Sequence, residues 1–293
     1  MDYKFKNFDV NADPPKDHYF MKPKSLSDNA TTTSIRPNLA RAIYKEWSIL
    51  QTSLPDSILV RAFETRIDLM RAVIVGSEGT PYYNGLFFFD IGFPYNYPND
   101  PPTVVYHPRP GLYMNPNFHS NGLVCLSIIN TWPGNQDEAW NPQKSTILQV
   151  LVSIQGLVLH ENPYLNDPNS VHPFTTIEIC RFNRKLFART HESMLYMLRN
   201  PPDQFQYFVA KHFDSQANNI LSNFKMRLRS NSMKALFLDL AEAFEVNGSD
   251  CREEIDQVKK MDKVRGSIAV KIVDKLMYLL CCDCFFEFLF SPS

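Results

Sequence analysis

The chain lacks a long uncharged apolar run and carries no excess charge of either sign. Its most apolar stretch, residues 276–290, is interrupted by Asp283 and Glu287 and is too short to cross a bilayer. The formal net charge of −1 argues against a role dominated by nucleic-acid or membrane-surface electrostatics. The first twenty residues are charged and lack the apolar core of a secretion signal. We therefore expect no nucleic-acid partner, and membrane association only through the apolar C-terminal tail.

Paired cysteine spacings and glycine-rich segments are also missing. The six cysteines in 293 residues do not form the regular pattern of a disulfide framework, so we expect free thiols in a reducing compartment, the cytoplasm or the nucleus. Ten glycines against twenty-one prolines predict long, rigid loops and not low-complexity linkers. The length permits one large or two modest folded domains.

Helical and strand-like segments divide the chain into three regions. Residues 1–33 show little periodicity and are predicted to be a mobile leader, although their aromatic side chains could dock elsewhere. Residues 34–200 are predicted to form the main folded domain, and residues 201–293 a helical C-terminal extension. Within the domain, strand-like segments follow a helix at 37–51 and occupy residues 58–63, 69–75, 85–91 and 103–106. Their short connections predict an antiparallel meander.

Apolar residues at helical spacing predict the inner faces of two helices around this meander. In the first helix these residues are Leu39, Ile43, Trp47 and Leu50. The second helix, at 145–160 with Ser145 as its cap, has the inner face Ile147, Leu148, Leu151, Ile154 and Val158. Further helices are predicted at residues 173–199, 203–228 and 232–246, and from 253 into the tail.

Cys125 is the strongest candidate for a reactive group. An Asn-Gly turn at 121–122 precedes it, which places the thiol near the edge of an element. A packed core cysteine is the competing interpretation, since free cysteine is commonly buried. A protease-like pair would need a histidine base, and no motif places one beside Cys125. The available histidines are His107, His119 and His160.

The motifs around Cys125 resemble the active region of ubiquitin-conjugating enzymes. In order, they are a proline-rich segment at 93–102, Asn-Pro-Asn at 115–117, the Asn-Gly turn, Val-Cys-Leu at 124–126 and Trp-Asn-Pro at 140–142. Asn115 replaces the family's usual histidine, and the loop at 130–139 is extended. Both features make the chain most similar to the large hybrid conjugating and ligase type, and within it to plant members related to phosphate homeostasis. The resemblance covers about residues 35–200 and implies an α+β ubiquitin-conjugating fold with a four-stranded meander flanked by helices.

The same resemblance implies the chemistry. Cys125 would accept ubiquitin as a thioester from an activating enzyme and pass it to substrate lysines, alone or with a ligase. No bound cofactor or metal is implied, because the activating enzyme consumes the ATP. Asn117 matches the asparagine that donates a hydrogen bond to the tetrahedral oxyanion; bracing the loop, or acting only as a turn residue, are the alternatives. A non-catalytic ubiquitin-binding adaptor and a conjugating enzyme for a small ubiquitin-like modifier are the competing functions.

Two positions that often carry acids in the family do not carry them here. Ser127 stands two residues after the cysteine, and Leu165 stands two residues beyond Asn-Pro. Asp167 and Glu161 are the candidate carboxylates for orienting the acceptor lysine, with a solvated or capping role as the alternative for both.

The resemblance also implies binding surfaces on the catalytic domain. Val152 and Gly156 match positions that contact the thioester-linked ubiquitin. Pro94, Tyr95 and Pro142 match the surface for the activating enzyme and ligases, where an exposed aromatic side chain suits an interface. Each of these could instead be an ordinary helix or loop residue.

A cysteine cluster in the tail admits three interpretations. It consists of Cys281, Cys282 and Cys284, with only Cys251 as a distant partner, and does not form the two spaced pairs typical of zinc. Acylation at a membrane is the second interpretation. We expect the third, an apolar helix that packs on the domain or on a partner, and we expect Cys180 in the core.

Overall fold

The structure is a computed structural model that describes residues 5–21, 36–107, 111–167 and 175–264. Contacts divide the chain into two compact units. The first comprises Met1–Asn166 with Pro202–Gln206, and the second Asp167–Pro201 with Tyr207–Ser293. The domain boundaries predicted at residues 33 and 200 stay predictions.

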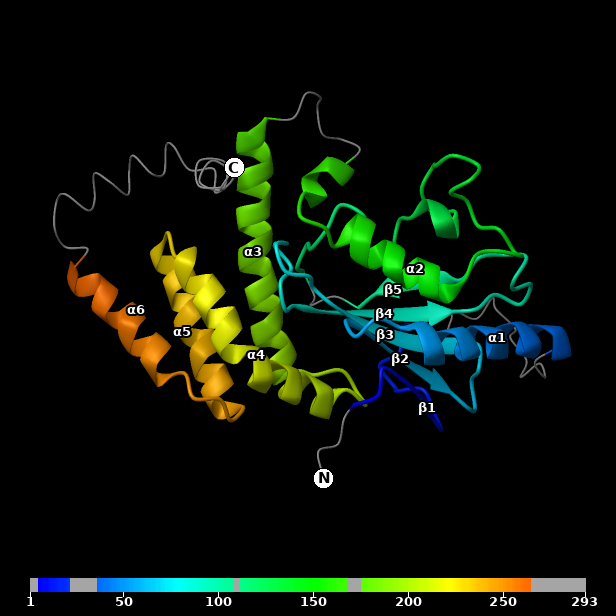
Figure 1. The fold of residues 1–293 in the computed structure, drawn as a ribbon, viewed down its shortest axis with the longest axis horizontal. Helices are drawn as coiled ribbons and strands as arrows, with labels where there is room; N and C mark the ends of the chain where they lie inside the picture. The colour runs from blue at the N-terminus through cyan, green and yellow to red at the C-terminus, as the bar shows by residue number, and fades with distance from the viewer. Residues whose placement is uncertain (1–4, 22–35, 108–110, 168–174, 265–293) are drawn as a thin grey trace. The chain divides into compact units, whose positions relative to one another are not determined.

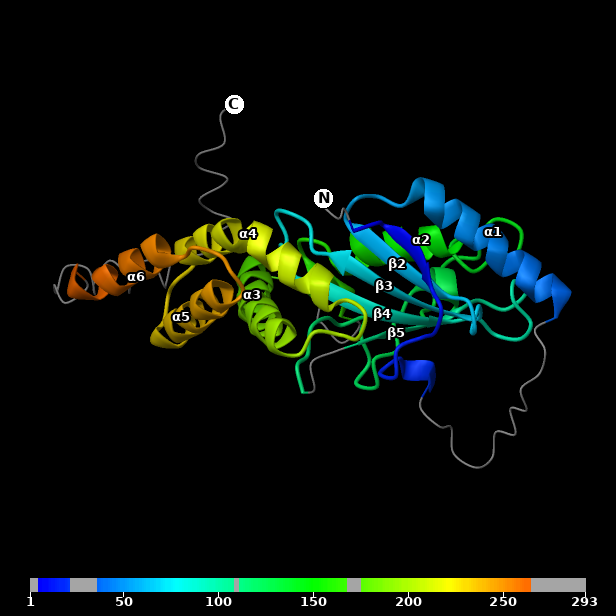
Figure 2. The same ribbon diagram turned by 90° about the horizontal axis from the view of Figure 1, so that it is seen from below.

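A five-stranded sheet forms the centre of the first unit (Figure 1). Its strands, in spatial order, are β1 Phe8–Asn11, β2 Ile58–Phe63, β3 Leu69–Val75, β4 Leu86–Gly92 and β5 Thr103–Tyr106. The last four, labelled in Figure 2, pair antiparallel, as the sequence predicts, because their turns are short. β1 pairs in parallel with β2 at one edge of the sheet (Figure 1). The α+β prediction is confirmed, with one strand more than the predicted four.

Residues 5–21 belong to this folded unit, so the prediction of a mobile leader is wrong for them. After β1 the segment reaches β3, where His18 is fully buried. The His18 Nε2 atom lies 3.0 Å from the carbonyl oxygen of Met70. A short 3-10 turn, Tyr19–Met21, ends the segment. The Phe8 side chain does dock, since its ring lies 6.3 Å, centroid to centroid, from Trp47. The rest of the predicted leader lies outside the described residues.

A buried ion network attaches this segment to the sheet. Arg71 and Asp90 are in register across β3 and β4, with Arg71 Nε 2.6 Å from Asp90 Oδ1 and Nη2 2.9 Å from Oδ2. Arg71 Nη1 also donates to Asp17 (2.7 Å), and the Tyr19 backbone N–H donates to Asp90 (2.8 Å). Burial alone would raise the pKa of Asp90, but its contacts with His107 and the Arg71 guanidinium outweigh burial and hold that pKa well below its usual range.

Removing the Asp90 charge should therefore cost stability in a pH-dependent way. Because the folded-state pKa is lowered, its contribution is complete above the unfolded pKa of about 4 and is lost as the pH falls below that value. The Asp90→Asn variant leaves Arg71 buried with less compensation, and we expect its free energy of unfolding at pH 7 to fall by about 3 kcal/mol. Urea denaturation measures this, with the exposed Asp100→Asn as the control. If the difference in unfolding free energy between Asp90→Asn and wild type did not narrow between pH 5 and pH 2, the lowered pKa of Asp90 would not be the cause.

Two helices accompany the sheet of the first unit. α1 Pro37–Ser53 begins at its proline as predicted, and buries Leu39, Ile43, Glu46 and Leu50. Trp47, predicted on the inner face, is only half-buried. α2 Ile147–Ser153 continues directly into a π-helical turn, Ile154–Val158. Val150 of α2 is buried and Leu148, predicted on the inner face, is only half-buried, because the buried face follows the helical spacing of residues 147, 150, 151 and 154.

The cap of α2 is Thr146 and not the predicted Ser145. The Thr146 side chain accepts a hydrogen bond from the Gln149 backbone, and the Gln149 side chain accepts one from the Thr146 backbone. The Ser145 hydroxyl oxygen instead accepts a hydrogen bond from the Asn141 N–H (2.9 Å). The sequence prediction of this cap is therefore wrong by one residue.

Glu46 of α1, which the sequence did not single out, joins the proline-rich segment to the start of α2. The proline-rich segment in turn contacts the end of the active loop, residues 112–140, which contain Cys125. Glu46 Oε1 accepts from the Tyr97 hydroxyl (2.8 Å) in the proline-rich segment, and Glu46 Oε2 accepts from the Ile147 N–H (2.9 Å) at the start of α2. Burial raises the pKa of Glu46, and these two donors partly offset that rise. Tyr97 packs 5.7 Å from Trp140, whose Nε1 donates to the Pro98 carbonyl oxygen (2.7 Å). The proline-rich segment and the end of the active loop are thus held together.

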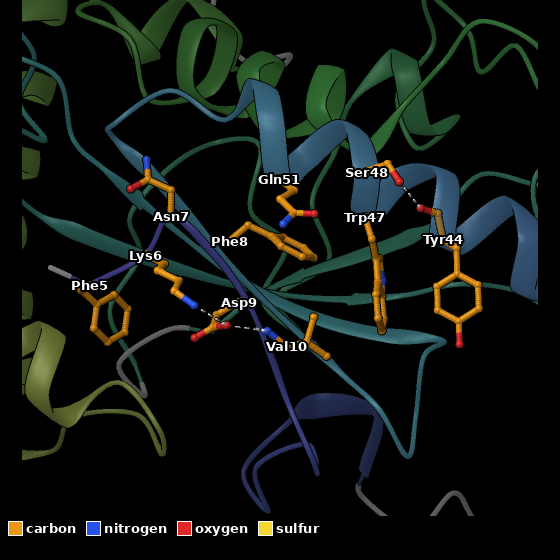
Figure 3. Close-up of a pocket in the computed structure, with 10 residues that line it drawn as sticks. All are labelled: Phe5, Lys6, Asn7, Phe8, Asp9, Val10, Tyr44, Trp47, Ser48 and Gln51. Carbon is orange, nitrogen blue, oxygen red and sulfur yellow. Dashed lines mark hydrogen bonds and ion pairs between the residues drawn. The ribbon is translucent and has the colours of Figure 1, made fainter. Parts of the chain in front are cut away.

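A cavity of about 660 Å³ opens between β1 and α1 (Figure 3). It is lined by residues 5–10 and by Tyr44, Trp47, Ser48 and Gln51. The cavity lies at the β1 edge of the sheet, which is the edge opposite to β5. No residue of the loop around Cys125 lines it.

The second unit is helical. Its helices are α3 Thr176–Arg199, α4 Gln206–Met226, α5 Asn231–Val246 and α6 Arg252–Val264, within a few residues of the prediction except that α6 is described only to Val264. Phe224 of α4 lies at the centre, 5.5 Å from Phe187 of α3 and 5.5 Å from Phe237 of α5 by ring centroids. No helix in the described part of the chain is long and apolar enough to span a membrane.

The cysteines outside the active loop differ in exposure. Cys180, predicted in the core, is only half-buried, because its part of α3 is largely exposed. Cys251 is buried, and burial together with nearby carboxylates raises its pKa to about 11. The predicted tail helix with its cysteine cluster, and with it the membrane prediction, lies outside the described residues.

Candidate active site

Cys125 lies after β5 in a segment that is hydrogen-bonded along its backbone. The Val124 N–H donates to the Val104 carbonyl oxygen of β5 (3.1 Å), and the Cys125 N–H donates to the Asn117 carbonyl oxygen (2.8 Å). The 3-10 turn Ser127–Ile129 follows. Cys125 is only 4% exposed, and burial raises the pKa of its thiol. Backbone hydrogen bonds therefore fix the position of Cys125, and its thiol is mostly protonated at neutral pH.

The extended loop returns to the cysteine segment through Thr131. Its hydroxyl accepts from the Leu126 N–H (2.9 Å) and donates to the Val124 carbonyl oxygen (2.7 Å), so one side chain bonds the residues on both sides of the cysteine. Asn130 adopts the left-handed conformation, and its Oδ1 accepts from the Trp140 N–H (3.0 Å). The two ends of the loop are thus tied together. Sequence reasoning missed Thr131, for which no motif gives a signal.

Asn115, the residue that replaces the family's histidine, is fully buried. Its Nδ2 donates to the Val158 carbonyl oxygen (2.7 Å) and to the Tyr82 hydroxyl (2.5 Å), while its Oδ1 accepts from the Asn117 N–H (2.8 Å). The side chain therefore fixes the backbone of Asn117 relative to the end of the π-helical turn.

Asn117 and Cys125 are bonded to each other twice. The Asn117 carbonyl oxygen accepts from the Cys125 N–H (2.8 Å), and Asn117 Nδ2 donates to the Cys125 carbonyl oxygen (3.0 Å). The Oδ1 of Asn117 accepts from Asn166 Nδ2 (2.9 Å). The structure thus brings together the two residues predicted to be catalytic. It adds Asn166, whose only sequence signal was its place just after the Asn-Pro pair that ends the helix.

The predicted ubiquitin-contacting residues both lie on the exposed face of the helix. Val152 is 46% exposed, and Gly156 is exposed as well. Leu157, at 62% exposed, extends this face towards the end of the π-helical turn. Its exposure was not anticipated.

The predicted surface for the activating enzyme and ligases is also accessible in part. Tyr95 is 55% exposed, with the Arg36 guanidinium carbon 3.9 Å from its ring centroid. Pro142 is exposed and Pro94 is half-buried. The binding roles of these residues stay predictions.

The candidate lysine-orienting carboxylates are not brought together with Cys125 by the contacts described. Glu161 is exposed and accepts from Asn162 Nδ2 (3.2 Å). Asp167 is half-buried and begins the second unit. Their role stays a prediction.

Ser127, two residues after the cysteine, lies close to the extended loop. A Cβ atom on Gly134 would come 2.4 Å from Ser127 Oγ and 2.7 Å from Glu138 Oε2, so this approach requires glycine. Glu138, which sequence reasoning did not single out, therefore places a carboxylate near Ser127, the position at which the resemblance implies an acid. In the described chain, no group of three His, Cys, Asp or Glu side chains could hold a metal ion.

Comparison with known proteins shows the family of this chain. Residues 42–194 match the family model described as ubiquitin-conjugating enzyme. The chain belongs to the ubiquitin-conjugating enzyme family. It is 45% identical over 223 residues to the "Probable ubiquitin-conjugating enzyme E2 25" of Arabidopsis thaliana, covering 74% of this chain and 35% of that protein. The "Putative ubiquitin-conjugating enzyme E2 38" of the same plant is 43% identical over 221 residues, covering 74% and 66% respectively.

A third similar protein is a hybrid of the predicted type. The human "Dual E2 ubiquitin-conjugating enzyme/E3 ubiquitin-protein ligase BIRC6" is 39% identical over 207 residues, covering 67% of this chain and 4% of that protein. The predicted resemblance to this family is thus confirmed. The matched region spans between about a third and two thirds of the length of the first plant relatives.

Proposed function

We propose that this member of the ubiquitin-conjugating family accepts the C-terminus of ubiquitin as a thioester on Cys125 and transfers it to lysines of protein substrates. The observation that carries the proposal is the pair of hydrogen bonds between Asn117 and Cys125. One joins the two predicted catalytic residues through their backbones, and the other through the Asn117 side chain. An activating enzyme supplies the ubiquitin and consumes the ATP, so this chain binds no cofactor. Transfer proceeds alone or with a ligase, in the cytoplasm or the nucleus.

Loading is a thioester exchange, in which the ubiquitin acyl group passes from the cysteine of the activating enzyme to Cys125. The Cys125 thiolate attacks the carbonyl carbon of the ubiquitin thioester on the activating enzyme, a new carbon–sulfur bond forms, and the cysteine of the activating enzyme leaves. Because burial raises the pKa of Cys125, the reactive thiolate is a minor species at neutral pH. The thioester is a sufficiently good acceptor for this small fraction to react, so a nearby histidine base is not required.

Discharge requires stabilisation of a tetrahedral intermediate. The lysine amine attacks the thioester carbonyl, whose oxygen becomes negatively charged before the Cys125 sulfur leaves. Asn117 Nδ2 carries two hydrogens, and its bond to the Cys125 carbonyl oxygen uses one of them. The second hydrogen is the donor we assign to the oxyanion. Asp167 or Glu161 would orient or deprotonate the incoming lysine.

Two accessible surfaces of the catalytic domain provide the partner contacts of this proposal. Val152 and Gly156, extended by Leu157, would contact the thioester-linked ubiquitin. The activating enzyme and a ligase would bind the surface of Tyr95, Pro94 and Pro142. Tyr95 provides the exposed aromatic area that interfaces favour.

Incubation with activating enzyme, ATP and ubiquitin, followed by a chase with free lysine, tests the function. We expect a ubiquitin adduct that reductant removes and that free lysine discharges. The absence of any adduct would overturn the proposal. An adduct that lysine never discharges would favour the adaptor, and loading with a small ubiquitin-like modifier in place of ubiquitin would favour that class of conjugating enzyme.

A further inference from the structure

Two carbonyl groups at the end of the π-helical turn are bonded by asparagine side chains. The Leu157 carbonyl oxygen accepts from Asn166 Nδ2 (2.7 Å), and the Val158 carbonyl oxygen accepts from Asn115 Nδ2 (2.7 Å). The last carbonyls of a helix have no partner within the helix, so they need donors from elsewhere. Both asparagines in turn bond Asn117, one through its backbone and the other through its side chain.

The Asn166 bond fixes which way the Asn117 amide points. Asn166 presents its nitrogen to Leu157, because a carbonyl oxygen can only accept, and the same nitrogen meets Asn117 Oδ1 at 2.9 Å. Asn117 must then direct its own nitrogen towards the Cys125 carbonyl oxygen, which also can only accept. A chain of amides between two carbonyl oxygens has one arrangement that satisfies every bond.

We propose that Asn166 is a positioning residue for ubiquitin transfer, which holds the Asn117 amide with its nitrogen towards Cys125. The proposal rests on the proposed function of Cys125 and Asn117. Asn166 acts through Asn117, which is buried, while Asn166 is half-buried in the 3-10 turn Pro163–Asn166. Its effect is therefore on discharge, the step in which Asn117 donates, and not on loading.

Substitutions of Asn166 should affect the reaction in a graded manner. Asn166→Ala removes one bond to the Asn117 oxygen and frees the amide to rotate, which should slow discharge about tenfold. Asn166→Asp places carboxylate oxygens against both the Leu157 carbonyl and Asn117 Oδ1. It competes with Cys125 for the Asn117 nitrogen, so discharge should slow further, by up to about 10²-fold.

The experiment is single-turnover discharge of the preformed thioester by free lysine, on the full chain. Loading should be normal in both variants. The maximal rate should fall while the lysine concentration at half-maximal rate stays unchanged, since Asn166 does not bind lysine. Asn219→Asp, an exposed asparagine bonded to Gln216 in α4, controls for the change of charge and should discharge at the wild-type rate.

A second background separates positioning from general structure. In Asn117→Ala protein, neither Asn166 substitution should slow discharge further, because the residue through which it acts is absent. Wild-type rates in both single variants, or full additivity in the Asn117→Ala background, would overturn the proposal. Loss of loading or of folding in the Asn166 variants would also count against it. Absence of loading in wild-type protein would instead contradict the proposed function.

Discussion

The Cys125→Ala variant is expected to form no thioester, and the Cys125→Ser variant to carry ubiquitin as an oxygen ester that reductant does not remove. Both should lose transfer to lysine down to the detection limit, because removing the nucleophile of a covalent enzyme costs on the order of 10⁶-fold. The hydroxyl keeps the attacking atom in place, but its ester is a much poorer acceptor for an amine. Non-reducing and reducing gels of the loading reaction distinguish the two variants.

The other described cysteines provide matched controls for this result. Cys180→Ser changes a half-buried thiol in α3, and Cys251→Ser changes a buried one whose raised pKa of about 11 disfavours the thiolate. Both variants should load and discharge like wild type. Loss of the adduct in either of them, with loading retained in Cys125→Ala, would refute the assignment of the nucleophile.

The Asn117→Ala variant should load normally but discharge to free lysine about 10² to 10³ times more slowly. Loss of one hydrogen-bond donor to an oxyanion has this effect in other acyl-transfer enzymes. Loading should be spared because Cys125 keeps its position through its own N–H bond to the backbone of residue 117. Single-turnover discharge of isolated thioester measures the rate, and a wild-type rate would rule out the oxyanion role.

Loading and discharge measured on the same variant distinguish the two roles of Asn117. The bond from Nδ2 to the Cys125 carbonyl oxygen braces the loop in the resting protein. If bracing were its whole contribution, the fall in discharge would accompany a loss of unfolding free energy of about 1–3 kcal/mol and a defect in loading. A large fall in discharge with normal loading assigns the amide to the transition state.

The strands of the meander could be predicted from sequence because their signal is local. The segments at 58–63 and 69–75 agree with β2 and β3 at every residue, since β-branched and aromatic runs end there at turns. β1 could not be predicted in this way. It has four residues, and its parallel pairing depends on Val60 and its neighbours, about fifty positions away in the chain.

The same contrast holds at the active site. Ordered motifs predicted that Cys125 and Asn117 lie together, and the structure joins them by two hydrogen bonds. Asn166 is bonded to Asn117 across 49 positions, and Thr131 and Glu46 act through backbone groups that no side-chain pattern marks. Contacts of this kind depend on the final packing of loops and are not encoded in local periodicity.

Peptide mapping of the loaded wild-type protein shows directly whether the Cys125 sulfur is the atom that carries ubiquitin. Protein incubated with activating enzyme, ATP and ubiquitin is digested under non-reducing conditions at low pH, and the adduct is located by tandem mass spectrometry. We expect the C-terminal ubiquitin fragment on the peptide that contains Cys125, and its loss after treatment with reductant. A fragment found on Cys180, on Cys251 or only on lysines would contradict the assignment of Cys125.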